Sequence, residues 1–185
     1  MKQLSKNTST LLFITLIGLL VVLAFISYKK IKQFNDSVDW VMFTNEVKNK
    51  IIDLESNLKD AEVGQRDYLL TEDSIFLQPF IGAELRNRLV FAILDSLIRD
   101  NPVQYENLKN LKTLTDQRFL LLNYNLKLLK NNHINSFAHF YLLKGKYKMD
   151  EIRKQVVLIL QEEDRLLDER TKIKDRTATL TPIFL

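Results

Sequence analysis

Apolar residues recur along much of the chain at alternating steps of four and three residues. One such row comprises Trp40, Thr44, Val47, Ile51, Leu54, Leu58, Ala61, Gln65 and Tyr68. A second row comprises Met149, Ile152, Val156, Ile159, Glu163, Leu166, Arg170 and Ile173. This spacing is typical of the inner face of an α-helix in a left-handed bundle. The two rows predict a long first helix and a long last helix.

Two further helices are expected between these rows. One, with Pro79 early in it and ending near Pro102, has a predicted inner face of Leu77, Ile81, Leu85, Leu89, Ala92 and Leu97. The next runs from Pro102 to Asn131, with inner positions at Leu108, Leu111, Leu114, Leu122 and Leu129. Residues 135–143 are expected to form a short helical insertion that ends at Gly145, since glycine is frequent just after a helix.

The residues before the first row are apolar without interruption. Residues 11–28 carry no charge and, at 18 residues, are just long enough to cross a bilayer as a helix. A cleaved signal peptide is the main alternative, but the run continues into Lys29 and Lys30 without a small-residue cleavage pattern. We interpret it as a membrane anchor continuous with the first helix. Basic residues flank it on both sides, so charge alone leaves its orientation open.

Composition narrows the possible functions. The net charge of +4 comes from the five basic residues before Asn35, where no acid occurs; the rest of the chain is near neutral. The positive charge therefore belongs to the membrane flanks, and no nucleic-acid partner is expected. The absence of cysteine excludes disulfides and thiolate metal sites.

The fold class expected is all-α: an elongated up-down-up-down four-helix bundle with an N-terminal transmembrane helix continuous with the first bundle helix. The expected divisions are a cytoplasmic N-terminus (1–10), the transmembrane helix (11–28), a sensor bundle (29–176) and the start of a truncated second transmembrane helix (177–185). An even number of helices returns the last helix to the side where the first one entered.

Residues 60–71 carry a polar segment within the first helix, reading Asp-Ala-Glu-Val-Gly-Gln-Arg-Asp-Tyr-Leu-Leu-Thr. It resembles the signature of the CHASE domain of type three, Asp-Ala-Glu-Thr-Gly-Gln-Arg-Gly-Tyr-Leu-Leu-Thr-Gly, and departs from it at Val63, Asp67 and Glu72. Residues 40–47 resemble the family's Trp-Val-x-His-Thr-x-x-Val block, with Phe43 in place of His. Residues 145–170 resemble its last helix.

This resemblance implies an extracytoplasmic sensory input domain of a bacterial membrane receptor, most often a two-component sensor histidine kinase. The sensor would lie outside the cytoplasmic membrane as part of a homodimer. It would pass a small-molecule or protein stimulus through its first and last helices to a cytoplasmic kinase or other output domain.

Other readings remain open at this point. The same input domain could serve a chemotaxis transducer or a diguanylate cyclase, because a fold does not determine the output. A membrane-anchored structural bundle is a further alternative.

Polar residues on the apolar rows are the candidate ligand or signalling residues. Gln65, Arg118, Glu163 and Arg170 fall at or near core positions, where polar groups must be paired. They either pair across the bundle and set helix register, or contact a ligand at a moving interface. Three residues of the signature are added to this set, which thus comprises Glu62, Gln65, Arg66, Tyr68, Arg118, Glu163 and Arg170. Glu62 and Arg66 have the spacing of a helical ion pair.

No arrangement of catalytic residues is recognised in the chain. His133 and His139 are the only histidines, and neither forms a metal-ligand pair by spacing. We therefore expect this chain to have no enzymatic activity, metal or cofactor of its own.

Overall fold

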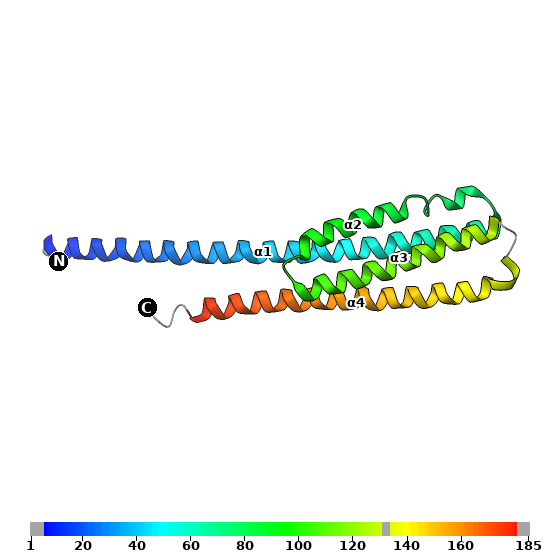
Figure 1. Cartoon of the computed structure of the whole chain (residues 1–185). Coiled ribbons are helices and arrows are strands. Elements are labelled where there is room, and N and C mark those ends of the chain that lie inside the picture. Colours follow the sequence, from blue (N-terminus) through cyan, green and yellow to red (C-terminus); the bar gives the residue numbers. More distant parts are fainter. Residues whose placement is uncertain (1–5, 131–133, 181–185) are drawn as a thin grey trace. The chain divides into compact units, whose positions relative to one another are not determined.

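In the computed structural model, the described backbone comprises residues 6–130 and 134–180, and the described side chains are those of residues 8–128 and 143–172. The elements are α1 (Lys6–Thr71), the 3-10 helix η1 (Ser74–Leu77), α2 (Ala83–Ile98), α3 (Pro102–Lys130) and α4 (Ile134–Leu180) (Figure 1). Within these ranges all regular structure is helical, as predicted. The chain divides into two compact units, residues 1–42 with 167–185 and residues 43–166.

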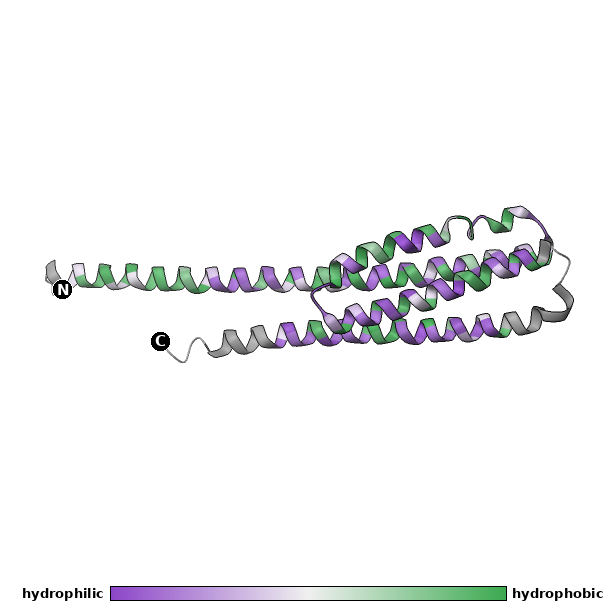
Figure 2. Cartoon of the chain, viewed as in Figure 1, coloured by the Kyte–Doolittle hydropathy of each residue, from purple (hydrophilic) through white to green (hydrophobic). Residues whose placement is uncertain are grey.

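The first unit contains the beginning of α1 and the end of α4. The side chains of residues 11–28 are exposed, and this part of α1 is the green, apolar stretch in Figure 2. Among the described helices, α1 is the one long and apolar enough to cross a membrane. Its continuity from Lys6 to Thr71 agrees with the predicted unbroken first helix.

The second unit is the helical bundle. Its core is formed by the predicted rows of α1 and α4 together with residues of α2 and α3, and includes Val47, Ile51, Leu58, Leu94, Ile98, Leu111, Leu122, Ile152 and Ile159. Side-chain hydrogen bonds to main-chain oxygens join its helices. Asn87 of α2 donates to the Leu54 oxygen of α1, and Gln65 of α1 donates to the Leu122 oxygen of α3. Each of these bonds gives a buried amide a partner.

Short connections set the ends of the helices. Glu72 follows α1 with φ 59, the left-handed conformation that favours glycine after a helix. Asp73 then caps η1 by accepting a hydrogen bond from Ile75 N at 3.0 Å. Between α2 and α3, the Asn101 side chain accepts hydrogen bonds from the main-chain nitrogens of Val103 and Gln104. This N-cap holds the beginning of α3.

The predicted inner face of α2 is wrong. The buried face is Ala83, Asn87, Phe91, Leu94 and Ile98, whereas Ile81, Leu85 and Leu89 are 58%, 61% and 59% exposed. Gly82 has the left-handed conformation with φ 76, so α2 begins only at Ala83 and does not continue the turn that contains Ile81. The row of Ile81, Leu85 and Leu89 was predicted to be buried because that row contains no polar residue comparable to Asn87.

The predicted end of a helix at Gly145 is also wrong. α4 runs without a break from Ile134 through Gly145 to Leu180. Gly145 is buried, and a Cβ atom there would lie 3.0 Å from Nη1 of Arg118. The glycine therefore makes room for a side chain of α3 and does not end a helix. Asn131 and His133 lie outside the described residues.

Candidate functional site

The signature segment of α1 faces α3 and α4 through Glu62. Its carboxylate lies 3.1 Å from Nη2 of Arg118, and the Arg118 side chain is almost completely buried while that of Glu62 is about one third exposed. Gly145 of α4 lies against the same guanidinium. We call Glu62, Arg118 and Gly145 the Arg118 niche; it joins three helices through one buried cation.

The hydrogen-bonding capacity of Arg118 is only partly used. Within the described part of the chain, its Nε and Nη1 atoms are buried and have no acceptor. A buried donor without an acceptor costs about 1–3 kcal/mol, more when it is charged. Two donors without a protein acceptor therefore reduce what the niche contributes to stability.

Two other signature residues have structural partners. Gln65 is buried and its amide donates to the Leu122 oxygen. Gly64 is also buried, and a Cβ atom there would lie 2.6 Å from the Phe76 oxygen and 3.2 Å from Pro79. Glycine is needed at this position because the chain after α1 folds back onto the helix.

The predicted ion pair between Glu62 and Arg66 is wrong. Glu62 reaches across to Arg118, and Arg66 is exposed with its Nε 3.6 Å from Asp67. A partner on another helix prevails because Arg118 is buried and, among the described residues, Glu62 is the carboxylate that lies beside it. Tyr68 is half-buried near the end of α1, and its main-chain oxygen accepts from Glu72 N at 2.8 Å.

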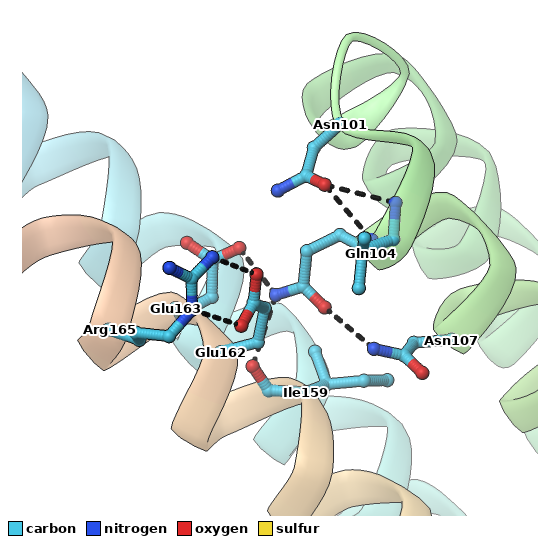
Figure 3. Close-up of polar contacts among 8 residues, drawn as sticks. Asn101, Gln104, Asn107, Ile159, Glu162, Glu163 and Arg165 are labelled. Atoms are coloured by element: carbon cyan, nitrogen blue, oxygen red, sulfur yellow. Dashed lines mark hydrogen bonds and ion pairs between the residues drawn. The ribbon is translucent and has the colours of Figure 1, made fainter. Parts of the chain in front are cut away.

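A second buried polar group lies between α3 and α4 (Figure 3). Gln104 is 0% exposed and Glu163 is 1% exposed. The Gln104 amide nitrogen donates to Oε1 of Glu163 at 2.7 Å and to the Ile159 oxygen at 3.1 Å. Its amide oxygen accepts from Asn107 at 3.4 Å. Gln104 thus uses both ends of its amide.

Gln155 of α4 extends this group by donating to the main-chain oxygen of Asn107 at 3.1 Å and to its side-chain oxygen at 3.3 Å. We call Gln104, Asn107, Gln155 and Glu163 the Gln104 cluster. Sequence reasoning identified only Glu163 of these four. The available signal was spacing, because Gln104 lies four residues before Leu108 on the inner row of α3.

Next to this cluster, on the outer side of α4, Glu162 pairs with Arg165. Two hydrogen bonds of 2.7 Å run from the guanidinium to the two carboxylate oxygens. These bonds hold the pKa of the Glu162 carboxyl below its ordinary value.

The first unit has a polar contact between its two helices. The Arg170 guanidinium lies over the Trp40 ring, 4.0 Å from its centre. A cation at this distance from an indole ring is held by a cation–π interaction. Trp40 belongs to α1 and Arg170 to α4, so the contact joins the first and last helices.

The structure thus brings Glu62 together with Arg118, and Arg170 with Trp40, while Arg66 and Tyr68 join neither group. No three His, Asp or Glu side chains among those described are grouped as metal ligands. His133 and His139 lie outside the described side chains. The chemistry available here is hydrogen bonding and ion pairing between helices.

Comparison with protein families gives a match over most of the chain. The CHASE3 domain family matches residues 37–172, which include the signature, the Arg118 niche and the Gln104 cluster. A comparison with curated proteins finds no match.

The fold is similar to a solved structure, the crystal structure of the Rhodopseudomonas palustris histidine kinase HK9 sensor domain. The two share 21% sequence identity with a TM-score of 0.62, over 68% of this chain and 98% of that one. At this identity the likeness establishes the helical fold.

Proposed function

The chain belongs to the CHASE3 domain family, and from this premise we propose that it is the extracytoplasmic sensory input domain of a membrane receptor, a two-component sensor histidine kinase. In this proposal residues 1–10 are cytoplasmic, residues 11–28 cross the inner membrane, residues 29–176 form the periplasmic sensor and residues 177–185 begin a second span. A stimulus changes the relation of the first and last helices, which pass the change to the output domain.

The contact between Trp40 and Arg170 is the main support for the relay. A relay through two helices needs a link between them close to the membrane, and this contact lies 12 residues after the end of the apolar run on α1. A cation–π contact is worth about 0.5–2 kcal/mol, which is enough to bias an equilibrium between two helix arrangements without locking it.

Membrane topology is tested by labelling single cysteines, since the chain has none of its own. Ser96→Cys, on the exposed face of α2, is expected to react with an impermeant maleimide in intact spheroplasts. Thr8→Cys is expected to react only after permeabilisation. The opposite pattern, or labelling of Ser96→Cys only after permeabilisation, would refute the extracytoplasmic position.

The relay is tested by Trp40→Ala in the full-length receptor, with autophosphorylation as the readout. We expect the ratio of stimulated to basal activity to change roughly two- to five-fold, the equivalent of about 0.5–1 kcal/mol. Trp40→Phe keeps an aromatic face and should largely preserve the ratio. Phe34→Ala, at an exposed position of the same helix, is the matched control. Equal ratios for Trp40→Ala and Phe34→Ala would argue against the relay.

We also propose that the receptor is a homodimer and that two copies meet at Ile81, Leu85 and Leu89. Leu85 and Leu89 are exposed and lie four residues apart on α2, and Ile81, also exposed, precedes the helix on the other side of Gly82. Anchors in one membrane make the two copies parallel, so a two-fold axis places this row against itself. Leu85→Glu together with Leu89→Glu should lower the dimer fraction in cross-linking, whereas Leu120→Glu, equally exposed on α3, should not.

A further inference from the structure

A groove of about 350 Å³ lies between α2 and α3. Its floor contains the apolar side chains of Phe91, Ala92 and Leu108, and Tyr105 adds an aromatic ring. Its full lining is Arg88, Phe91, Ala92, Asp95, Tyr105, Leu108, Lys109 and Lys112. The volume falls within the range of small-molecule sites in proteins.

The two ends of the groove differ in charge. α2 and α3 run in opposite directions on either side of the turn at residues 99–101, as Figure 1 shows. Asp95 and Tyr105 are therefore nearest the turn, and Arg88 and Lys112 are farthest from it. Seven residues separate Arg88 from Asp95, which corresponds to about 10 Å along a helix. The groove thus has two cations at one end, apolar side chains with Lys109 in the middle, and at the other end Asp95, which pairs with Arg99 at 2.9 Å.

The cations at the far end have partners that a ligand could replace. Arg88 lies 2.5 Å from Glu84 and Lys112 lies 3.4 Å from Asp116, each within its own helix. Both basic side chains are more than half exposed. Exposed pairs of this kind contribute about 0–1 kcal/mol, so exchanging one for a ligand carboxylate costs little.

We propose that this groove binds a small amphipathic carboxylate, with its carboxylate between Arg88 and Lys112 and its apolar body on Phe91, Ala92 and Leu108. A hydroxyl at the far end of such a ligand would donate to Asp95 beside Tyr105. The proposal rests on the proposed sensory function and adds a ligand class to it.

Charge and dimensions favour this occupant over a second copy of the chain. The row proposed for the dimer, Ile81, Leu85 and Leu89, is not part of the groove lining. An apolar floor with a cation pair at one end and a carboxylate at the other matches a single molecule of about 10 Å, with one charge of its own.

The test is calorimetric titration of the whole chain in neutral phosphatidylcholine nanodiscs, with empty nanodiscs as the blank. The probe is 4-phenylbutyrate, and 4-phenylbutylammonium is its charge-reversed counterpart. Lys112→Ala removes one cation, and Ala92→Phe fills the floor at an exposed position. Lys146→Ala is the matched control, because Lys146 is also more than half exposed and pairs with Asp150 at 3.2 Å with the same i,i+4 spacing.

We expect the carboxylate to bind about five-fold more tightly than the ammonium, since one exposed charge contact is worth up to about that ratio. Lys112→Ala should weaken binding about five-fold, Ala92→Phe should abolish it, and Lys146→Ala should leave it unchanged. Equal binding of the two probes, or unchanged binding to Ala92→Phe, would overturn the proposal. So would a shift of the dimer fraction by Ala92→Phe without loss of probe binding.

A second arm tests the acidic end. 4-(4-Hydroxyphenyl)butyrate should bind more tightly than 4-phenylbutyrate, and Asp95→Asn should reduce that advantage at least about two-fold. A hydroxyl with no advantage in the unsubstituted chain would overturn the proposed orientation. These binding measurements require no signalling output, so a failed site and a failed relay, tested by Trp40→Ala, are distinguishable.

Discussion

Gln104 and Arg118 lie on the same buried row of α3, yet their surroundings differ. Gln104 donates to Glu163 and to the Ile159 oxygen and accepts from Asn107, so its whole amide is used. Arg118 has one carboxylate partner, and its Nε and Nη1 atoms have no acceptor within the described residues. The comparison indicates that polarity in a helical core has two consequences. The Gln104 cluster joins α3 to α4 through hydrogen bonds that use the whole amide, whereas the two Arg118 donors without an acceptor reduce the stabilisation from the Arg118 niche.

The largest effect is expected from breaking the Gln104 cluster. Gln104→Leu removes the donor to a carboxylate that is 1% exposed, and we expect a loss of about 3 kcal/mol in the free energy of unfolding, measured by chemical denaturation. Adding Glu163→Leu should recover most of the loss, because replacing both buried partners is far less costly than removing one. Gln117→Leu, on the exposed face of α3, is the control. Equal losses for the single and double variants would contradict this account.

A double-mutant cycle of Arg118 and Gly145 tests whether the glycine makes room for the guanidinium in the Arg118 niche. Gly145→Ala in a helix interior should stabilise by about 1 kcal/mol from propensity alone. In the unsubstituted chain that gain should be lost, because the new Cβ would lie 3.0 Å from Nη1 of Arg118. In an Arg118→Leu background the gain should reappear. Thermal unfolding measures the coupling, expected at about 1 kcal/mol; additive effects would show that Gly145 does not make room for Arg118.

Arg118→Leu by itself provides the direct contrast with Gln104→Leu. We expect a change within about 1 kcal/mol of the unsubstituted chain, because two unpaired buried donors are removed and Glu62 remains accessible to water. A loss as large as that of Gln104→Leu, measured in the same denaturation assay, would mean that the guanidinium is better satisfied than its geometry indicates.

The smallest effect concerns Glu162, beside the Gln104 cluster. Its pKa is lowered by the hydrogen bonds from Arg165, so the pair stabilises the folded state above the ordinary pKa of a glutamate, near 4.3. That contribution is lost as the pH falls through the lowered pKa of the folded state. We expect Glu162→Gln to remove a few tenths of a kcal/mol at pH 7, and this loss should shrink as the pH falls through the lowered pKa of Glu162. Melting curves across this range measure the difference.

Periodicity alone was sufficient for the first and last helices. The predicted row of α1 is buried from Thr44 to Gln65, and that of α4 is buried from Met149 to Glu163. A single apolar row on each helix leaves one way to face a core, so the pattern decides the packing. α2 carries two candidate rows, and the buried one contains Asn87, whose amide donates to the Leu54 oxygen of α1.

The sequence by itself determined the helical class, the apolar run at residues 11–28, the membership of the family and the polar positions on the two long rows. Only the tertiary structure decided the partners of those polar residues. Glu62 pairs with Arg118 and not with Arg66, 4 residues away. Gly145 lies inside a helix, where Arg118 occupies the space that a Cβ atom would need. The physical reason is that local spacing specifies which face of a helix is buried, whereas the partner of a buried charge depends on residues that are distant in sequence and meet only when the helices pack.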